Sequence, residues 1–201
     1  MLSGAERVEI ARLWARKLEQ DASGLPLSQR HRNLEPVSAE FLHTLAAGTN
    51  ARRLVEIGGS SGISTIALAS AARETGGRLL SLEIEAARQA EARETLSRLG
   101  LAAFVDFVLA DAAQILPQQE PFDLVLIDCE KEDYIQFFDM LPIRGGGIVV
   151  ADNIISHSLA DYVAHVRKRP GAESVTLPIG KGLEVTRLVA HALVRAVFTL
   201  V

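Results

Sequence analysis

Cysteine is nearly absent from this sequence, and so is any excess of positive charge. The single cysteine among its 201 residues, Cys129, excludes a disulfide within the chain and favours a reducing compartment. The 21 Lys and Arg residues are outnumbered by 25 Asp and Glu residues, which gives a net charge of -4. Bulk electrostatics therefore do not favour a nucleic acid as partner, and none is expected.

The sequence also lacks a long uninterrupted apolar run and a targeting leader. The apolar end of the chain, residues 188–201, is interrupted by His191 and Arg195 and is shorter than the ~20 residues that span a bilayer. The first residues are polar and do not resemble a signal peptide. With 48% apolar and 23% charged residues, the composition is that of a globular protein. We expect a cytoplasmic protein with no membrane partner.

Apolar runs of strand length alternate with helical patterns from Arg52 onward. Strands are predicted at 54–57, 79–82, 105–109, 124–127, 148–150, 174–177 and 183–189. Two helices are predicted before the first strand, over about 4–20 and 38–48, and the second is expected to have Ser38 as its N-cap. The glycines at 145–147 are expected to precede the fifth strand. This alternation predicts an α/β fold with a doubly wound, mostly parallel seven-stranded sheet and helices on both faces.

Hard oxygen ligands follow two of the predicted strands. Asp128 comes directly after the strand at 124–127, while Asp152 and Asn153 follow the strand at 148–150. Open α/β sheets bind ligands just beyond the carboxyl ends of their strands, so these side chains are expected to meet. Two carboxylates and a carboxamide suit Mg²⁺ or another hard divalent cation, and the nearby Lys131 has the chemistry of a base. Taken singly, Asp128 is equally interpreted as a capping carboxylate and Lys131 as a surface lysine.

A glycine-rich loop follows the first predicted strand. Gly58 and Gly62 bracket the turn into the next helix, where backbone N–H groups face a ligand. The spacing Gly-x-x-x-Gly differs from that of NAD sites, and no P-loop lysine follows. Glu83 ends the second strand, where an acid accepts hydrogen bonds from a ribose diol. Because Glu56 and Asp111 add negative charge at this edge, a cationic cofactor is favoured over a polyphosphate. A tight turn without ligand is the alternative.

These segments together resemble a known family. The run Glu56-Ile-Gly58-Gly-Ser-Ser-Gly62-Ile-Ser64 resembles the first cofactor motif of the class I, S-adenosylmethionine-dependent O-methyltransferases of the catechol and caffeoyl-CoA type. Ser81-Leu-Glu83 resembles the ribose-binding acid of that family. Asp128-x-x-Lys131-x-x-Tyr134 and Ala151-Asp152-Asn153 resemble its metal and base motifs. The similarity covers about residues 36–189 and implies a Rossmann-like sheet.

The resemblance also implies roles for single residues. Mg²⁺ or another divalent cation would be held by Asp128, Asp152 and Asn153, and Lys131 would take the proton from a hydroxyl of a small acceptor with two neighbouring hydroxyls. The implied residues that hold S-adenosylmethionine are Glu56, Gly58, Ser60, Gly62, Ser64, Glu83, Asp111, Ala112 and Asp128. Glu184 lies in the region of an acid that some catechol enzymes use on the second hydroxyl, and its role stays open.

The length predicts a single methyltransferase domain over residues 1–201. Within it, 1–50 is expected to form a helical cap and substrate segment, 51–189 the cofactor-binding core, and 190–201 an apolar tail. The family and the apolar termini favour a homodimer. Residues 30–36 depart from the family pattern, which leaves the acceptor open. Methylation of RNA or protein, aided by Arg30, Arg32 and residues 167–169, is one alternative; a cofactor-binding module without catalysis is another.

Overall fold

A seven-stranded sheet forms the centre of the computed structural model, which describes residues 1–26 and 29–189. The strands are β1 (Arg53–Ile57), β2 (Arg78–Glu83), β3 (Val105–Leu109), β4 (Phe122–Ile127), β5 (Ile143–Ala151), β6 (Ala172–Leu177) and β7 (Leu183–Leu188). Their order is β3-β2-β1-β4-β5-β7-β6. The strands β1 to β5 are parallel, whereas β7 runs antiparallel to both of its neighbours, β5 and β6. The predicted fold class is confirmed.

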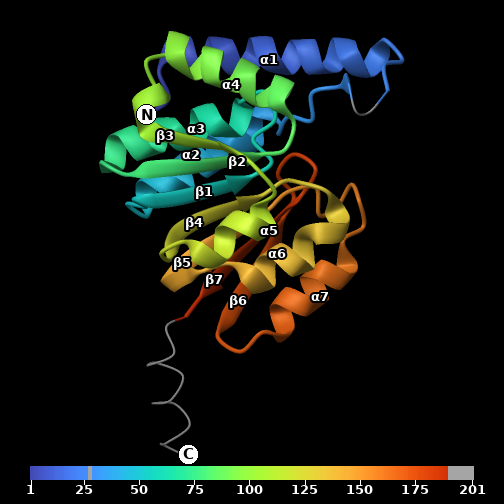
Figure 1. The fold of residues 1–201 in the computed structure, drawn as a ribbon. Helices are drawn as coiled ribbons and strands as arrows, with labels where there is room; N and C mark the ends of the chain where they lie inside the picture. The colour runs from blue at the N-terminus through green and yellow to red at the C-terminus, as the bar shows by residue number, and fades with distance from the viewer. Residues whose placement is uncertain (27–28, 190–201) are drawn as a thin grey trace, which may run out of the picture.

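Helices cover both faces of this sheet (Figure 1). One layer holds α1 (Gly4–Ala22), α2 (Pro36–Gly48), α3 (Ile63–Thr75) and α4 (Ala86–Arg98), and the other holds α5 (Ala112–Ile115), α6 (Tyr134–Met140) and α7 (Ala160–Lys168). Alternation along the strands produces this arrangement, since successive side chains point to opposite faces. In β4, Leu124 and Leu126 pack into one apolar cluster while Val125 and Ile127 pack into the other. A strand that is apolar on both faces is therefore buried between two helical layers.

The starts of β5 and α2 differ most from the predicted boundaries. The strand β5 begins at Ile143 and contains the three glycines, because the chain already pairs with Phe122 of β4 before the register shifts. A Cβ atom at Gly147 would lie 2.8 Å from the Ile143 side chain, so glycine permits this irregular pairing. The helix α2 begins at Pro36, and its N-cap is Glu35 instead of Ser38. Proline is favoured at the first helical position because its missing N–H is not needed there.

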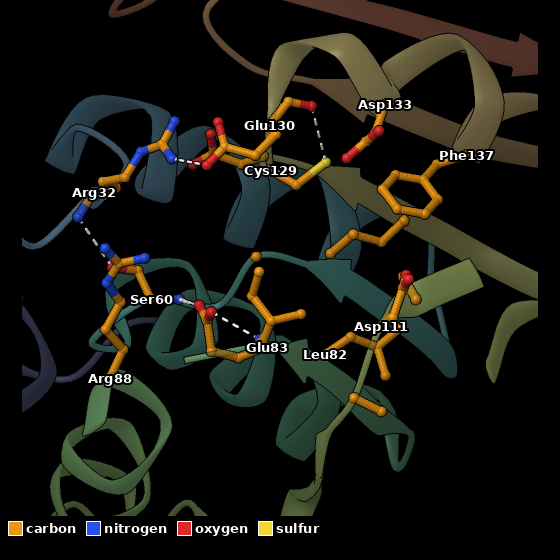
Figure 2. A pocket seen from close by; sticks show the side chains of 16 residues that line it. Arg32, Ser60, Leu82, Glu83, Arg88, Asp111, Cys129, Glu130, Asp133 and Phe137 are labelled. Carbon is orange, nitrogen blue, oxygen red and sulfur yellow. Dashed lines mark hydrogen bonds and ion pairs between the residues drawn. The ribbon is translucent and has the colours of Figure 1, made fainter. Parts of the chain in front are cut away.

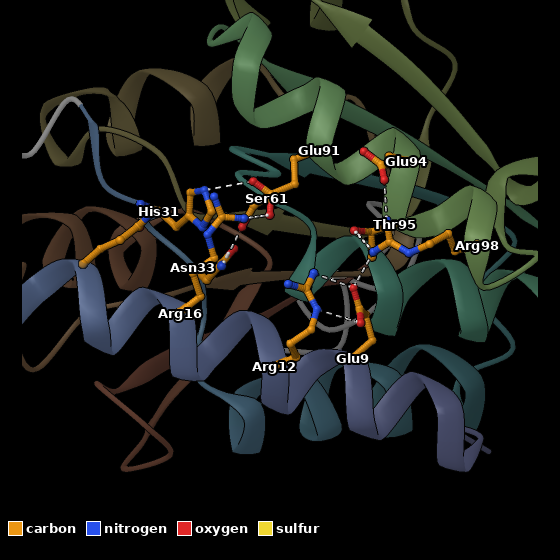
Figure 3. Close-up of polar contacts among 11 residues, drawn as sticks. Glu9, Arg12, Arg16, His31, Asn33, Ser61, Glu91, Glu94, Thr95 and Arg98 are labelled. Carbon is orange, nitrogen blue, oxygen red and sulfur yellow. Dashed lines mark hydrogen bonds and ion pairs between the residues drawn. The ribbon is translucent and has the colours of Figure 1, made fainter.

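The N-terminal helices pack on the core through polar contacts as well as apolar ones. In the first turn of α1, Ser3 and Glu6 form a capping box, and Glu6 also accepts hydrogen bonds from Arg73 at 2.7 Å and Ser70 at 3.0 Å on α3. Further along, Glu9 and Arg16 of α1 pair with residues of α4 (Figure 3). The proposed division of residues 1–50 from the core stays a prediction, and the tail at 190–201 lies outside the described residues.

Within residues 1–26 and 29–189, no helix combines the length and the apolar character that crossing a membrane requires.

Candidate active site

A cleft opens at the carboxyl ends of β1, β2 and β4. Six of the residues that the sequence predicted to hold a cofactor line it, namely Gly58, Ser60, Glu83, Asp111, Ala112 and Asp128. Figure 2 shows Ser60 and Glu83 on one side of the cleft, Cys129 and Glu130 on the other, Arg32 and Arg88 at one end, and Asp111 and Phe137 at the opposite end. The cleft therefore lies at the ligand-binding edge of an open α/β sheet.

The glycine-rich loop lies directly against the ends of β2 and β4. Gly58 has a φ of +94°, and a Cβ atom at this position would overlap the backbone carbonyl of Asp128. Its N–H donates to the Leu82 carbonyl at 2.9 Å. Ser60 also has a positive φ, 46°, although it is not glycine. The close contact between this loop and β4 leaves room for hydrogen at position 58 and for nothing larger.

Glu83 is held in place by backbone N–H groups. One of its carboxylate oxygens accepts from Ser60 at 2.8 Å, and the other accepts from Ile84 and Glu85, each at 2.9 Å. The residue is only 6% exposed. A carboxylate offers about four acceptor sites, so one remains for a hydroxyl donor in the cleft. This geometry fits the predicted contact with a ribose.

Three predicted cofactor residues lie beneath the loop and do not line the cleft. Glu56 is fully buried, where its Oε1 accepts from Thr65 at 2.6 Å and from Ser81 at 2.7 Å. Its Oε2 has no partner, and burial raises the pKa of this carboxyl. Gly62 packs against Ala92 of α4, and Ser64 is buried in the first turn of α3. Their direct contact with a cofactor stays a prediction.

Asp128, Asp152 and Asn153 meet beside the cleft, as their strand-end positions predict. The Nδ2 of Asn153 donates to Asp128 Oδ1 and to Asp152 Oδ2, both at 2.9 Å. Asn153 has a φ of 63°, a left-handed conformation that asparagine tolerates better than most residues. Burial, and then the charge of Asp128, raises the pKa of Asp152 to about 8. Burial likewise raises the pKa of Asp128, and the charge of Lys131 opposes that rise.

This oxygen-rich corner fits a hard divalent cation. Asp152 is 1% exposed, and its Oδ1 is buried without a partner. A cation beside it would satisfy that oxygen and offset the repulsion between the two carboxylates. Oxygen donors of this kind are the ligands of Mg²⁺ and Ca²⁺. Among the described residues, no three His, Cys, Asp or Glu side chains come together as a metal site. The proposed set of three metal ligands therefore depends on the side-chain amide of Asn153.

Lys131 reaches this corner from the short helix η4 (Lys131–Asp133). Its Nζ lies 3.3 Å from Asp128 Oδ1 and donates to the Tyr134 hydroxyl at 2.7 Å. Tyr134 in turn donates to the backbone carbonyl of Asp152 at 3.2 Å. The lysine side chain is 14% exposed and pairs with Asp128. An amine held in this way points at the proposed metal ligands, unlike a lysine that merely pairs with its own acidic loop.

No sequence pattern indicated that Arg32 would contribute to the cofactor cleft. Its backbone N–H donates to Ser60 Oγ at 3.1 Å, and its guanidinium pairs with Glu130. The neighbouring Asn33 donates to Ser61 Oγ at 2.8 Å. Each contact joins an irregular segment to a loop 28 residues further along the chain, so no periodicity or motif predicts it. The segment before α2 therefore covers the glycine-rich loop.

The surroundings of Cys129 and Glu184 bear on whether either side chain has a chemical role. Burial raises the pKa of the Cys129 thiol and so disfavours the thiolate that a nucleophilic cysteine requires. Glu184 is fully buried in β7, where it accepts from Arg167 at 3.0 Å and from Ser174 at 2.6 Å. It lies among the side chains of α7 and β6 and does not line the cleft.

The sheet order, the loop after β1 and the acids at the strand ends define the class of methyltransferase-type α/β proteins. A family model described as O-methyltransferase matches residues 16–187, and the chain belongs to that family.

Relatives and a solved structure agree with this assignment. The chain is similar to the catechol O-methyltransferase of Niastella koreensis, 35% identical over 130 residues (61% of this chain, 58% of the relative). It is 42% identical to that of Mycobacterium tuberculosis over 121 residues (58% and 54%). These matches span little more than half the length of either relative. The O-methyltransferase TomG from Streptomyces achromogenes, solved with SAM, superposes with a TM-score of 0.73 at 25% identity over 89% of each chain.

Proposed function

We propose that this chain transfers a methyl group from S-adenosylmethionine to one hydroxyl of a small vicinal-diol aromatic, in a reaction that depends on Mg²⁺ or another divalent cation. The observation that carries the proposal is the position of Asp128. It lines the cofactor cleft and also a second cleft, whose wall contains Lys131 and Asn153. The proposed base and metal ligands thus stand where a methyl donor and an acceptor would meet.

The chain's own residues suit the proposed donor. S-adenosylmethionine supplies a methyl group on a positively charged sulfur. Glu83 would hold its ribose, and the absence of a side chain at Gly58 would let it approach the backbone closely. The acidic groups Glu83, Asp111 and Asp128 in the cleft wall favour a cation over a polyphosphate. The SAM complex of TomG, a structural neighbour, supports the same choice.

The acceptor hydroxyl has to lose a proton, and Lys131 is placed to take it. A bound Mg²⁺ would supply positive charge that lowers the pKa of an adjacent hydroxyl and fixes its direction. Asp128, Asp152 and Asn153 would hold that ion. Neutral Lys131 would accept the proton at Nζ, and the resulting ammonium would be stabilised by Asp128 at 3.3 Å. Orientation of the hydroxyl toward the methyl group accounts for the remaining acceleration.

Transfer of labelled methyl from S-adenosylmethionine to a panel of catechols and caffeoyl esters tests this proposal. We expect transfer with Mg²⁺, loss of transfer with EDTA, and recovery when Mg²⁺ is restored. Asp152→Ala should be inactive, because it removes the buried carboxylate with the unpartnered oxygen. Asp161→Ala, which removes an exposed carboxylate on α7, is the matched control. Transfer that is insensitive to EDTA would contradict the metal.

The basic residues invoked for an RNA or protein acceptor do not gather on one surface of the site. Arg30 and Arg32 line the second cleft, but none of residues 167–169 does. Arg167 of α7 pairs with Glu184 at 3.0 Å. Arg169, which directly follows α7, lies 4.0 Å from Asp139 of α6. Cofactor binding without transfer to any small diol would revive this alternative or that of a non-catalytic module.

A further inference from the structure

The second cleft is unusual for a pocket that would hold an aromatic ring. Among the described residues, its walls come from the end of α1, the segment before α2, the turn from β2 into α4, the loops after β4 and β5, and the loop between β6 and β7. Among these lining residues there is no Phe, Tyr or Trp, and Ile84 is the single aliphatic side chain. Small-molecule pockets are mostly apolar, with a few polar groups that set orientation. A neutral catechol would find one aliphatic side chain here, together with the carbon stems of the Lys and Arg residues.

The wall of this cleft is instead rich in positive charge. Six Lys and Arg side chains line it, against four carboxylates, so the wall has a net formal charge of +2, or of +1 with Lys131 neutral as the proposed base, in a chain of net charge -4. The cationic residues are Lys17, Arg30, Arg32, Arg88, Lys131 and Lys181. A cation at the proposed metal site would add to this charge. Clefts lined by one sign of charge concentrate ligands of the opposite sign.

Two of these cations flank the proposed reaction centre. Arg32 and Lys181 line the second cleft together with Asp128 and Lys131. The Arg32 side chain is 38% exposed, and its guanidinium pairs with Glu130 through Nη1. The Lys181 side chain is 34% exposed and lies 3.5 Å from Glu35. A guanidinium has five N–H donors and an ammonium has three, so both retain donors for a ligand.

A buried histidine in the same wall has one ring nitrogen without a hydrogen-bond partner. The His31 side chain is 9% exposed, and its Nε2 lies 3.0 Å from Glu91 (Figure 3). Its Nδ1 is buried without a hydrogen-bond partner.

We propose that the acceptor carries an anionic group away from its reacting hydroxyls, and that Arg32 and Lys181 bind that group. The inference rests on the proposed function, since it assigns the acceptor's chemical class at the same site. Charge-assisted hydrogen bonds from these two residues would make the enzyme select an acidic diol over a neutral one of equal shape.

Two nearly isosteric acceptors test the selection, 3,4-dihydroxybenzoate and the neutral 3,4-dihydroxybenzamide. We expect kcat/KM to favour the benzoate by about tenfold or more, the magnitude of one charged hydrogen bond. That ratio should fall toward one in Arg32→Gln and in Lys181→Gln, and it should also fall as salt is added. Lys168→Gln makes the same charge change at an exposed position on α7 and should leave the ratio unaltered.

Calorimetric binding of both acceptors, with Mg²⁺ and S-adenosylhomocysteine present, separates this inference from the proposed function. Tighter binding of the benzoate that depends on Arg32 and Lys181, but without turnover, would uphold the anion site and overturn the diol methyl transfer. Turnover of both compounds with equal kcat/KM would uphold the transfer and overturn the anion site. A preference for the benzamide, or a benzoate preference that survives both substitutions, would also overturn it.

Discussion

At the scale of single residues, the surroundings of Lys131 lead to the first prediction. Its amine is held by the Tyr134 hydroxyl and by Asp128, and it does not line the cofactor cleft. Lys131→Ala should therefore lower kcat by about 10²- to 10⁴-fold, the usual contribution of a general base. The dissociation constant of S-adenosylhomocysteine, measured by calorimetry, should change by less than about threefold. The exposed Lys168→Ala is the control. Turnover within a few-fold of wild type would remove Lys131 from the mechanism.

Gly58 allows a prediction that separates steric overlap from backbone strain. Gly58→Ala would place a Cβ against the Asp128 carbonyl at a φ of +94°. Gly76 has a φ of +68° and nothing within 4 Å of the corresponding Cβ position. Gly76→Ala should cost about 1–3 kcal/mol from strain alone. Gly58→Ala should cost more in urea unfolding and should also weaken S-adenosylhomocysteine binding. Equal costs with unchanged binding would show that the loop has room to move.

The site residues whose positions could be predicted from the sequence are those that directly follow strands. Asp128, Asp152 and Asn153 follow strands that became neighbours in the sheet, so their meeting follows from topology. Glu56 was also expected to contact the cofactor because it lies near a strand end, but its side chain accepts hydrogen bonds from Thr65 and Ser81 beneath the loop. The contact between Arg32 and Ser60 depends on how an irregular segment folds back, which no local pattern encodes.

At the scale of elements, the start of α1 depends on one buried carboxylate. Glu6 completes the capping box with Ser3 and pairs with Arg73 at 2.7 Å, while its own side chain is 2% exposed. Burial alone would raise the pKa of Glu6. Hydrogen bonds from Arg73, Ser3 and Ser70 lower the pKa by more than burial raises it, so it lies below the ordinary 4.5. Attachment of α1 to α3 therefore relies on the ionised form.

The sign of this shift gives a pH prediction. A carboxylate with a lowered folded-state pKa stabilises the protein above its unfolded pKa and loses that effect as pH falls through the folded value. Glu6→Gln should thus destabilise the protein at pH 7, and the difference from wild type should shrink below about pH 4.5. Urea unfolding at several pH values measures it. Glu40→Gln, an exposed acid on α2, should show a smaller difference; a pH-independent cost for Glu6→Gln would contradict the linkage.

Element boundaries were less predictable than element types. Seven strands were expected, and seven form within the described residues; central β4 is almost wholly buried, whereas the edge strand β6 is only half-buried. The glycine tract at 145–147 carries no strand signal of its own and joins β5 only because β4 lies beside it. The helix α2 begins at Pro36, because the proline ring suits the first turn of a helix. The prediction that Ser38 is the N-cap was therefore wrong.

At the scale of the whole molecule, the cofactor cleft joins parts that are distant in sequence. Its walls include the segment before α2, the loop after β1, the end of β2 and the loops after β3 and β4. The strand β1 lies between β2 and β4, so the chain turns in opposite directions on its two sides and leaves the crevice there. A ligand in this crevice contacts all of these segments at once, and its binding energy therefore adds to the stability of the complete fold.

That coupling predicts a large stabilisation by S-adenosylhomocysteine. At a concentration of 100 times its dissociation constant, a ligand of the native state adds about 2.7 kcal/mol, which raises the melting temperature of a protein of this size by about 5–10 °C. Glu83→Gln should reduce the shift at the same ligand concentration, because its carboxylate is the acceptor proposed for the ribose. Glu85→Gln, a substitution at a neighbouring acid outside the cofactor cleft, is the matched control. A shift produced by NAD and not by S-adenosylhomocysteine would overturn the cofactor assignment, whereas a shift that survives Glu83→Gln would overturn only the role of that residue.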